Sequence, residues 1–481
     1  MYRTMAFVGV ATAAITMAAA ARAESPSELL EKGIYTEETA GDLDGAIAIY
    51  EKVVAEAKAG QALAAQAQFR LGQCLLKKDR KAEATAAFEK LIRDYPGEKE
   101  LLAKARKFVP EGLPMGPVPW ADGEVLQIDM RLTTGMDIGT VYYTSRSADL
   151  DGRKIWRVGS QTVAWVGNVY GASSVDADWD TFRPISSCFK MTPLGTFNAR
   201  FSPSQVVVSS EGPDGKVTER TFDETQVVYD NEQAMDVMRR LPFAPDYKTT
   251  LPVFAAMGAG NILFPLEVKC VEKVKVPAGE FECFKVHLGM VNQDFWFSND
   301  AHRYLVKFEA GAVIAELASV EQIKPGETRQ YENAQCGFSL TSPNDWFFHV
   351  LREDKPGDVK AFILDPQGDA YTEMTVVKNA DMKAEEQESL RKWMDGKVES
   401  LGKMKKDFVV RADSWQERTL AGRSTLSVVA DWSGGKQKKV DFYAAVRIDA
   451  GVLFFAYSIP AAQFDDFRKQ FDAIIDTLKV K

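Results

Sequence analysis

A proline-rich segment separates two kinds of apolar pattern in this chain. Residues 109–120, VPEGLPMGPVPW, contain four prolines in twelve positions, which is typical of a stiff, extended linker. Before the segment, apolar residues recur every three or four positions, as in helices. After it, they alternate with polar residues, as in strands. The sequence therefore predicts a helical region at 24–109, a linker at 110–121 and β-rich regions beyond.

The first 23 residues have the pattern of an export signal. Arg3 precedes an apolar, alanine-rich run at 5–21, and Ala21 and Ala23 provide the small residues of a cleavage site. An uncleaved membrane anchor is the alternative, but the run is short for a membrane span. We expect a mature chain that begins at Glu24, has no transmembrane segment and is periplasmic or secreted.

Charge and length limit the classes of function. A chain of 481 residues fits about three domains. Loss of Arg3 and Arg22 with the signal takes the formal net charge from -9 to -11, which disfavours nucleic acid as a partner.

The five cysteines fit neither a compact disulfide framework nor a zinc site. Cys270 and Cys283 flank a predicted hairpin turn at 277–280. That turn would place Cys283 opposite Val274 and Cys270 opposite His287, too far apart for a disulfide. We therefore expect buried free thiols. The cysteines are Cys74, Cys188, Cys270, Cys283 and Cys336.

The helical region contains the spacing of a known repeat. A Leu71-Gly72 pair is followed by Ala84, Phe88 and Pro96. This segment resembles the tetratricopeptide repeat, in which small residues let two helices approach, an aromatic ring fills the space between them and proline ends the unit.

A looser copy precedes this repeat. Ala46 and Tyr50 stand 38 residues before Ala84 and Phe88, but the copy lacks the Leu-Gly pair and the closing proline. A capping helix is expected within 98–109. The resemblance implies partner binding on the inner face of the helix that precedes Ala84.

The expected partner-binding residues are polar or aromatic. Mixed side chains of this kind suit a groove for a protein or peptide, although Phe69 could equally belong to the core. The residues are Gln66, Phe69, Gln73 and Lys77.

The middle region, 122–323, reads as antiparallel strands that form an all-β sandwich or partial barrel, interrupted by one helix at 231–241. The stretches VDADWDTFRP and VPAGEFECFKV resemble a bacterial family of exported β-rich domains of unknown function. An open β domain could hold an apolar ligand, so a carrier of lipid or lipoprotein is the alternative function.

Neither a metal site nor a cofactor is predicted. Asp176, Asp178 and Asp180 alternate, but a calcium loop needs glycine at its sixth position and glutamate at its twelfth, where Ser187 stands. Solvated acids explain the pattern more simply.

No catalytic residues are predicted either. The histidines are His287, His302 and His349, and they lack metalloprotease spacing; no Gly-x-Ser-x-Gly elbow occurs. Asp300 and His302 could meet a serine in space, as residues of any large protein could. A non-enzymatic protein is expected, and a hydrolase is the third hypothesis.

The last region follows a second polar break at 324–331 and covers 332–481. Strands with an internal helix and a terminal helix predict an α+β sandwich. Phe338, Pro343 and Trp346 open the region, which resembles the PsbP-like fold, whose members commonly act as accessory or binding proteins. Together the three regions predict an exported modular scaffold or adaptor that binds a protein partner through its repeats.

Overall fold

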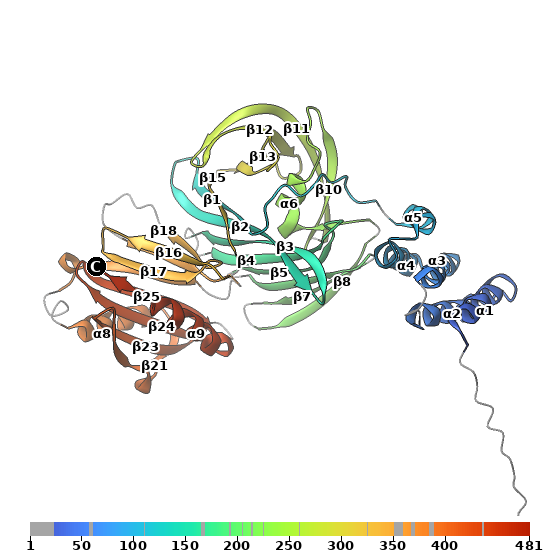
Figure 1. Cartoon of the computed structure of the whole chain (residues 1–481). Helices are drawn as coiled ribbons and strands as arrows, with labels where there is room; N and C mark the ends of the chain where they lie inside the picture. Colours follow the sequence, from blue (N-terminus) through green and yellow to red (C-terminus); the bar gives the residue numbers. More distant parts are fainter. Residues whose placement is uncertain are drawn as a thin grey trace, which may run out of the picture. The chain divides into compact units, whose positions relative to one another are not determined.

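The computed structural model divides the chain into two compact units, Met1–Pro110 and Glu111–Lys481 (Figure 1). The predicted export signal lies outside the described residues. The structure describes all residues except 1–23, 57–60, 110, 165–168, 192–193, 204, 213–214, 225, 259, 325, 351–358, 367–370, 384–388 and 435–436.

The first unit is a series of antiparallel helices, as the sequence predicts. Ser25 caps the first helix, because its side chain accepts a hydrogen bond from the backbone N–H of Glu28 while the Glu28 carboxylate accepts one from the backbone N–H of Ser25. The elements are α1 (Pro26–Glu38), α2 (Leu43–Glu56), α3 (Gln61–Lys77), α4 (Lys81–Asp94), α5 (Lys99–Ala105) and η1 (Arg106–Phe108).

The middle region forms one strongly curved sheet of 15 strands, the partial barrel of the two predicted forms. Sequence neighbours from β1 to β8 and from β10 to β15 pair antiparallel, whereas β9 pairs parallel with β10. β1 also pairs with β15, which joins the first strand of the region to the last. The strands are β1 (Glu124–Leu132), β2 (Asp137–Leu150), β3 (Arg153–Ala164), β4 (Val169–Asp178), β5 (Pro184–Met191), β6 (Gly195–Phe201), β7 (Gln205–Glu211), β8 (Val217–Asp223), β9 (Tyr229–Asp230), β10 (Lys248–Ala255), β11 (Gly260–Val276), β12 (Gly279–Leu288), β13 (Gln293–Ser298), β14 (Leu305–Ala310) and β15 (Val313–Gln322).

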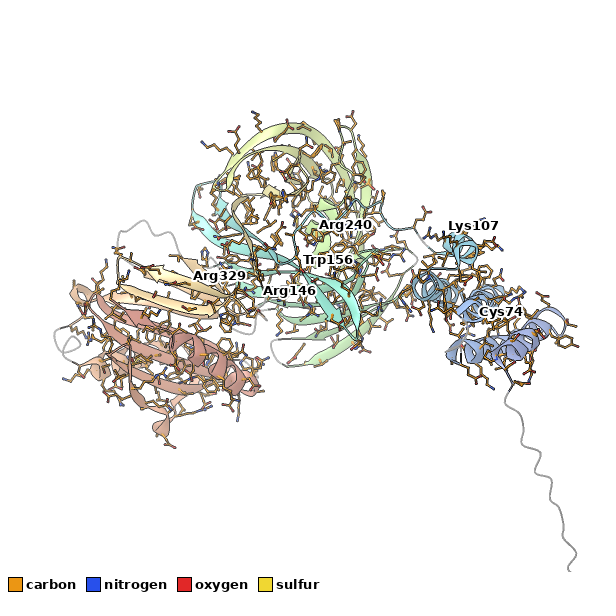
Figure 2. The ribbon with its side chains drawn as sticks, viewed as in Figure 1. Cys74, Lys107, Arg146, Trp156, Arg240 and Arg329 are labelled. Atoms are coloured by element: carbon orange, nitrogen blue, oxygen red, sulfur yellow. The ribbon has the colours of Figure 1, made fainter. Side chains whose placement is uncertain are left out.

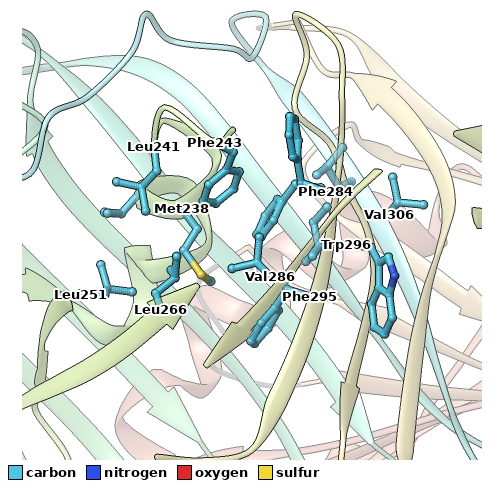
Figure 3. Close-up of a cluster of buried hydrophobic side chains, with 14 of the residues drawn as sticks. Met238, Leu241, Phe243, Leu251, Leu266, Phe284, Val286, Phe295, Trp296 and Val306 are labelled. Carbon is cyan, nitrogen blue, oxygen red and sulfur yellow. The ribbon is translucent and has the colours of Figure 1, made fainter. Parts of the chain in front are cut away.

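The predicted helix of this region lies inside the curve of the sheet (Figure 1). It consists of η2 (Asn231–Gln233) and α6 (Ala234–Arg239). Met238 and Leu241 are buried beside Leu251 and Leu266 in the main hydrophobic cluster, which Figure 3 shows. Side chains of this helical segment therefore lie in the space that the alternative hypothesis assigns to an apolar ligand.

The proline-rich segment, predicted as a stiff, extended linker, is hydrogen-bonded to the β region. The backbone N–H of Gly116 donates to the Arg240 carbonyl at 2.7 Å, and the Arg240 Nε donates back to the Gly116 carbonyl at 3.1 Å. Trp120 is buried and meets Trp156 edge to face, with ring centroids 5.7 Å apart. The segment thus packs against the β region.

The hairpin between β11 and β12 has a shorter turn than predicted. Val276 pairs with Gly279, so Pro277 and Ala278 form a two-residue turn. Cys283 consequently lies opposite Glu272, not Val274, and Cys270 opposite Lys285, not His287. None of the five cysteines, all of which the structure describes, forms a disulfide, but Cys270 is exposed and Cys188 is half-buried, which corrects the expectation of burial for these two.

The C-terminal region is the predicted α+β structure. Its eight-stranded sheet carries one helix on each face, because Phe442 and Tyr443 alternate on β24 and belong to different clusters: Phe442 packs with α9 and Tyr443 with α8. A three-stranded sheet adjoins it, and its β16 begins within the second predicted linker. The elements are β16 (Thr328–Asn333), β17 (Phe338–Pro343), β18 (Phe347–Val350), β19 (Val359–Leu364), β20 (Tyr371–Lys378), η3 (Asn379–Asp381), α8 (Leu390–Gly402), β21 (Lys406–Val410), η4 (Ala412–Ser414), β22 (Gln416–Leu420), β23 (Arg423–Gly434), β24 (Gln437–Ile448), β25 (Gly451–Pro460), η5 (Ala461–Gln463), α9 (Phe464–Ile475) and β26 (Lys479–Val480).

Contacts join the β region and the α+β region within the second unit. The ring of Tyr142 stacks on Phe347 with centroids 4.4 Å apart, and the Tyr142 hydroxyl donates to the Phe348 carbonyl at 3.2 Å. Because these residues belong to one compact unit, the predicted boundary between the two regions remains a prediction.

Candidate partner-binding site

Two glycines set the spacing of the paired helices. A Cβ atom on Gly72 would lie 2.7 Å from the Phe88 ring, and one on Gly33 would lie 2.6 Å from the Tyr50 ring. In each helix pair, an aromatic ring of the second helix therefore packs directly against a glycine of the first. Gly33 is the counterpart of Gly72, although lysine rather than leucine precedes it, and the looser copy retains this part of the pattern.

Gln66 and Gln73 lie seven residues apart on one side of α3 and are half-buried. Neither side chain has a hydrogen-bond partner among the described residues. Gln68, by contrast, is buried and donates from its amide to the Ala87 carbonyl at 3.0 Å. Gln68 thus fastens α3 to α4, whereas Gln66 and Gln73 retain free amide groups.

Phe69 is a core residue in this structure. Its side chain is 9% exposed, and its ring lies 5.6 Å from the Phe88 ring. The ring of Phe88 also stacks on Phe108, at 4.8 Å. Phe69 could have contacted a partner or belonged to the core, and its burial agrees with core packing.

Lys77 takes part in an ion cluster that joins α1 to α3. Its Nζ lies 2.7 Å from a Glu37 carboxylate oxygen, and the Arg70 guanidinium lies 3.1 Å from the other. The Tyr50 hydroxyl also donates to Glu37, at 2.7 Å. Since the Glu37 side chain is 2% exposed, three donors compensate for the burial of its charge.

The cluster shifts the pKa values of its members. Burial alone would raise the pKa of Glu37, but the hydrogen bonds from Lys77, Tyr50 and Arg70 lower it below its usual value. Burial and the neighbouring Glu37 charge raise the pKa of Cys74 to about 12, so this thiol, labelled in Figure 2, is protonated and unreactive at neutral pH.

The role of Glu37 is not apparent in the sequence, because a Glu-Glu pair at the end of a helix normally reads as solvated surface. Contacts with α2 and α3 bury it. The cluster fixes α1 and α3 side by side, whereas the half-buried amides of Gln66 and Gln73 on α3 take no part in it.

A second buried polar network surrounds α6. Arg239 is buried, its guanidinium lies 2.7 Å from a Glu124 carboxylate oxygen, and it donates to the His302 and Arg303 carbonyls at 3.0 Å. Ser145 donates to Asp236 at 3.1 Å. These contacts attach the helix to the surrounding sheet.

The start of the helical segment is attached in the same way. The hydroxyl of Ser187 donates to Asp230 at 2.7 Å, and the Gln233 amide donates to the Phe182 carbonyl at 3.0 Å. Burial raises the pKa of Asp230 to about 7 and that of Asp236 to about 6. The two carboxyl groups with raised pKa values therefore have a structural role in this network.

Two of the three alternating acids have structural partners. Asp176 forms a bidentate pair with Arg157 at 2.6 and 3.0 Å, and Asp178 accepts from the backbone and hydroxyl of Thr181. In the described part of the chain, no group of three His, Cys, Asp or Glu side chains could hold a metal ion. His287, one of the three histidines, is bonded to Asp294 at 2.7 Å.

Family comparisons match two parts of the chain. Residues 66–97 match the tetratricopeptide repeat, which confirms the resemblance seen in this segment. Residues 127–317 match a family described as protein of unknown function (DUF3108), which lies within the predicted β domain. No curated protein matches the chain.

Several solved structures are similar to parts of the chain. The cyanobacterial PsbP protein CyanoP of Synechocystis has 13% identity and a TM-score of 0.27, over 33% of this chain and 95% of that protein. A beta-barrel-like DUF1849 protein of Brucella abortus has 10% identity and a TM-score of 0.30, over 42% and 98%. LpqN of Mycobacterium tuberculosis, involved in cell envelope biogenesis, has 14% identity and a TM-score of 0.21, over 32% and 91%.

TM-scores this low do not indicate a shared function. Among the described helices, each is too short or too polar to cross a membrane.

Proposed function

We propose that the chain is an exported adaptor that binds a protein partner through its tetratricopeptide repeats and does not act as an enzyme. The observation that carries the proposal is the pair Gln66 and Gln73 on α3. Their amides are half-buried, point to the same side and have no internal partner among the described residues. Such groups can donate to and accept from the backbone of a bound segment.

The surrounding contacts support this role. Phe69 and the Glu37 cluster hold α3 rigidly against α4 and α1, so the two amides would be presented in a fixed geometry. A preorganised surface loses less conformational entropy when it binds. In the proposal, the second unit is the body that carries this surface.

Site-specific photo-crosslinking in native cells tests the proposal. A photoreactive amino acid replaces Gln73 in the full-length chain, and Glu51 on the exposed side of α2 is the matched control position. We expect one discrete adduct from position 73, none from position 51, and loss of the adduct when Gln66→Glu is added. Equal labelling from both positions, or no adduct from position 73, contradicts repeat-mediated binding.

Export is tested separately. We expect the protein recovered from the periplasm or medium to begin at Glu24. An intact amino terminus in the cytoplasm contradicts this part of the proposal without affecting the binding test.

A further inference from the structure

The strand β21 lies at one end of the eight-stranded sheet. On one side it pairs with β23, and among the described residues no strand pairs with its other side. The backbone N–H of Arg411 donates to the Val429 carbonyl at 3.0 Å. Because hydrogen-bonding direction alternates along an antiparallel strand, the N–H and C=O of Val410 point away from β23. The outer edge of β21 can therefore pair with another strand.

A groove runs beside this edge. Its lining includes Val398 and Gly402 of α8 and the apolar side chains of Phe408, Val410 and Trp415, around a volume of about 630 Å³. The remaining lining residues are charged: Asp395, Glu399, Lys403 and Lys405. The guanidinium of Arg391, next to the groove, lies 3.6 Å from the centroid of the Trp415 ring and holds the indole in place. Phe408 and Val410 thus have backbone N–H and C=O groups at the outer edge of the sheet, and their side chains line the groove.

The edge has little of the usual protection against pairing. Val409 is 61% exposed and Met404 is 77% exposed. A bulge between Lys406 and Val409 interrupts the pairing with β23, and Asp407 has a φ of 54° there. Bulges of this type can blunt an edge. Phe408 lies within the bulge, but Val409 and Val410 pair with β23 again and remain in the strand.

Charge distinguishes the two ends of the edge. Arg411, after the strand, is neutralised by a bidentate pair with Asp431 at 2.7 and 2.8 Å. At the other end, Lys406 and Lys438 are both exposed and both pair with Ser433 in the sheet register, so they lie on the same face. The beginning of β21 is therefore basic. A strand that is added antiparallel ends at this position.

We propose that β21 binds an extended segment of a partner protein by antiparallel strand addition, with apolar side chains in the groove and an acidic residue or carboxylate at the segment's C-terminal end. Main-chain hydrogen bonds to Phe408 and Val410 provide affinity, and the groove and Lys406 provide specificity. This site is distinct from the helical repeats, so the adaptor would have two binding surfaces.

A defined peptide tests the proposal on the full chain. The probe is a fluorescein-labelled peptide of about seven alternating threonines and valines that ends in aspartate, long enough to cover an edge strand. We expect saturable binding, slower hydrogen exchange at the Phe408 and Val410 amides, and loss of binding when alternate peptide nitrogens are methylated. Lys406→Glu should weaken binding about tenfold, because attraction becomes repulsion.

The matched control is Lys469→Glu on α9, which is also exposed and should leave binding unchanged. A peptide that ends in lysine should bind Lys406→Glu more tightly than the native chain. Absence of binding, equal binding to the two variants, or exchange protection elsewhere overturns the proposal. So does sedimentation of the chain as a dimer that Lys406→Glu dissociates, because the occupant would then be a second copy.

Discussion

Single residues decide how the helical unit is held together, and Glu37 is the clearest case. Its buried carboxylate accepts hydrogen bonds from Tyr50, Arg70 and Lys77, each from a helix other than its own. Lys77 was expected to contact a partner. Its ammonium instead has an internal counterion, although its side chain is 54% exposed.

Glu37→Gln should lower the free energy of unfolding by about 2 kcal/mol, because hydrogen bonds to a charged group are among the stronger ones. Urea unfolding of the full chain, followed by helical circular dichroism, measures the change. Glu31→Gln on the exposed side of α1 is the control and should have almost no effect. Equal stability of the two variants contradicts a structural role for Glu37.

The buried carboxyl of Asp230 predicts a pH dependence. Its pKa is raised from 3.8 to about 7, mainly by burial, and the neighbouring Glu232 adds to the shift. The folded chain therefore binds more protons than the unfolded chain between these values, so this contribution to stability is largest below pH ~4 and is lost as the pH rises to ~7.

We expect the native chain to unfold at a higher urea concentration at pH 5 than at pH 8, and Asp230→Asn to reduce the difference. Asp180→Asn, in an exposed turn of the same region, should leave it unchanged. An unaltered pH profile in Asp230→Asn contradicts the assignment.

At the scale of elements, close contacts between helices depend on glycines, although glycine has a low intrinsic helix propensity. Replacement of glycine by alanine inside a helix normally stabilises by about 1 kcal/mol. Gly72 cannot show this gain, because a Cβ there would overlap the Phe88 ring. Gly396, in the middle of α8, has open space around it.

Gly72→Ala should therefore destabilise the chain by about 1–3 kcal/mol through overpacking, whereas Gly396→Ala should stabilise it by about 0.5–1 kcal/mol. Unfolding free energies from circular dichroism give both values. Stabilisation by Gly72→Ala contradicts the close contact between α3 and α4.

At the scale of the molecule, the β region and the α+β region are joined by side chains far apart in sequence. Tyr142 is 3% exposed, and its ring and hydroxyl both contact residues near β18. The apolar cluster around it also includes Val125, Ile323 and Phe362. This cluster couples the two regions of the second unit.

Tyr142→Ala should cost about 3–5 kcal/mol, because it leaves a cavity in the cluster. It should also separate the unfolding of the second unit into two transitions in calorimetry. Tyr142→Phe keeps the ring and should cost only about 1 kcal/mol. One cooperative transition with near-native stability in Tyr142→Ala contradicts the coupling.

Local sequence patterns were enough to predict the helices and strands and two residues of the candidate partner-binding site. The apolar period indicates helices before residue 110 and strands after it, because each period reflects which face of an element is covered. Leu71, Gly72, Ala84 and Phe88 identified a repeat, and its pattern placed Gln66 and Gln73 on the side of α3 for which we propose partner binding, without reference to any distant contact.

Which apolar faces of the helices and strands pack against one another became clear from the tertiary structure alone. Burial of Phe69, the ion cluster at Glu37, the packing of residues 112–120 and the exposed edge of β21 each depend on contacts between elements remote in sequence. A periodic pattern shows that a face is apolar or that a charge is present. The partner that covers the face or neutralises the charge is set by long-range packing, so it could not be read from local sequence.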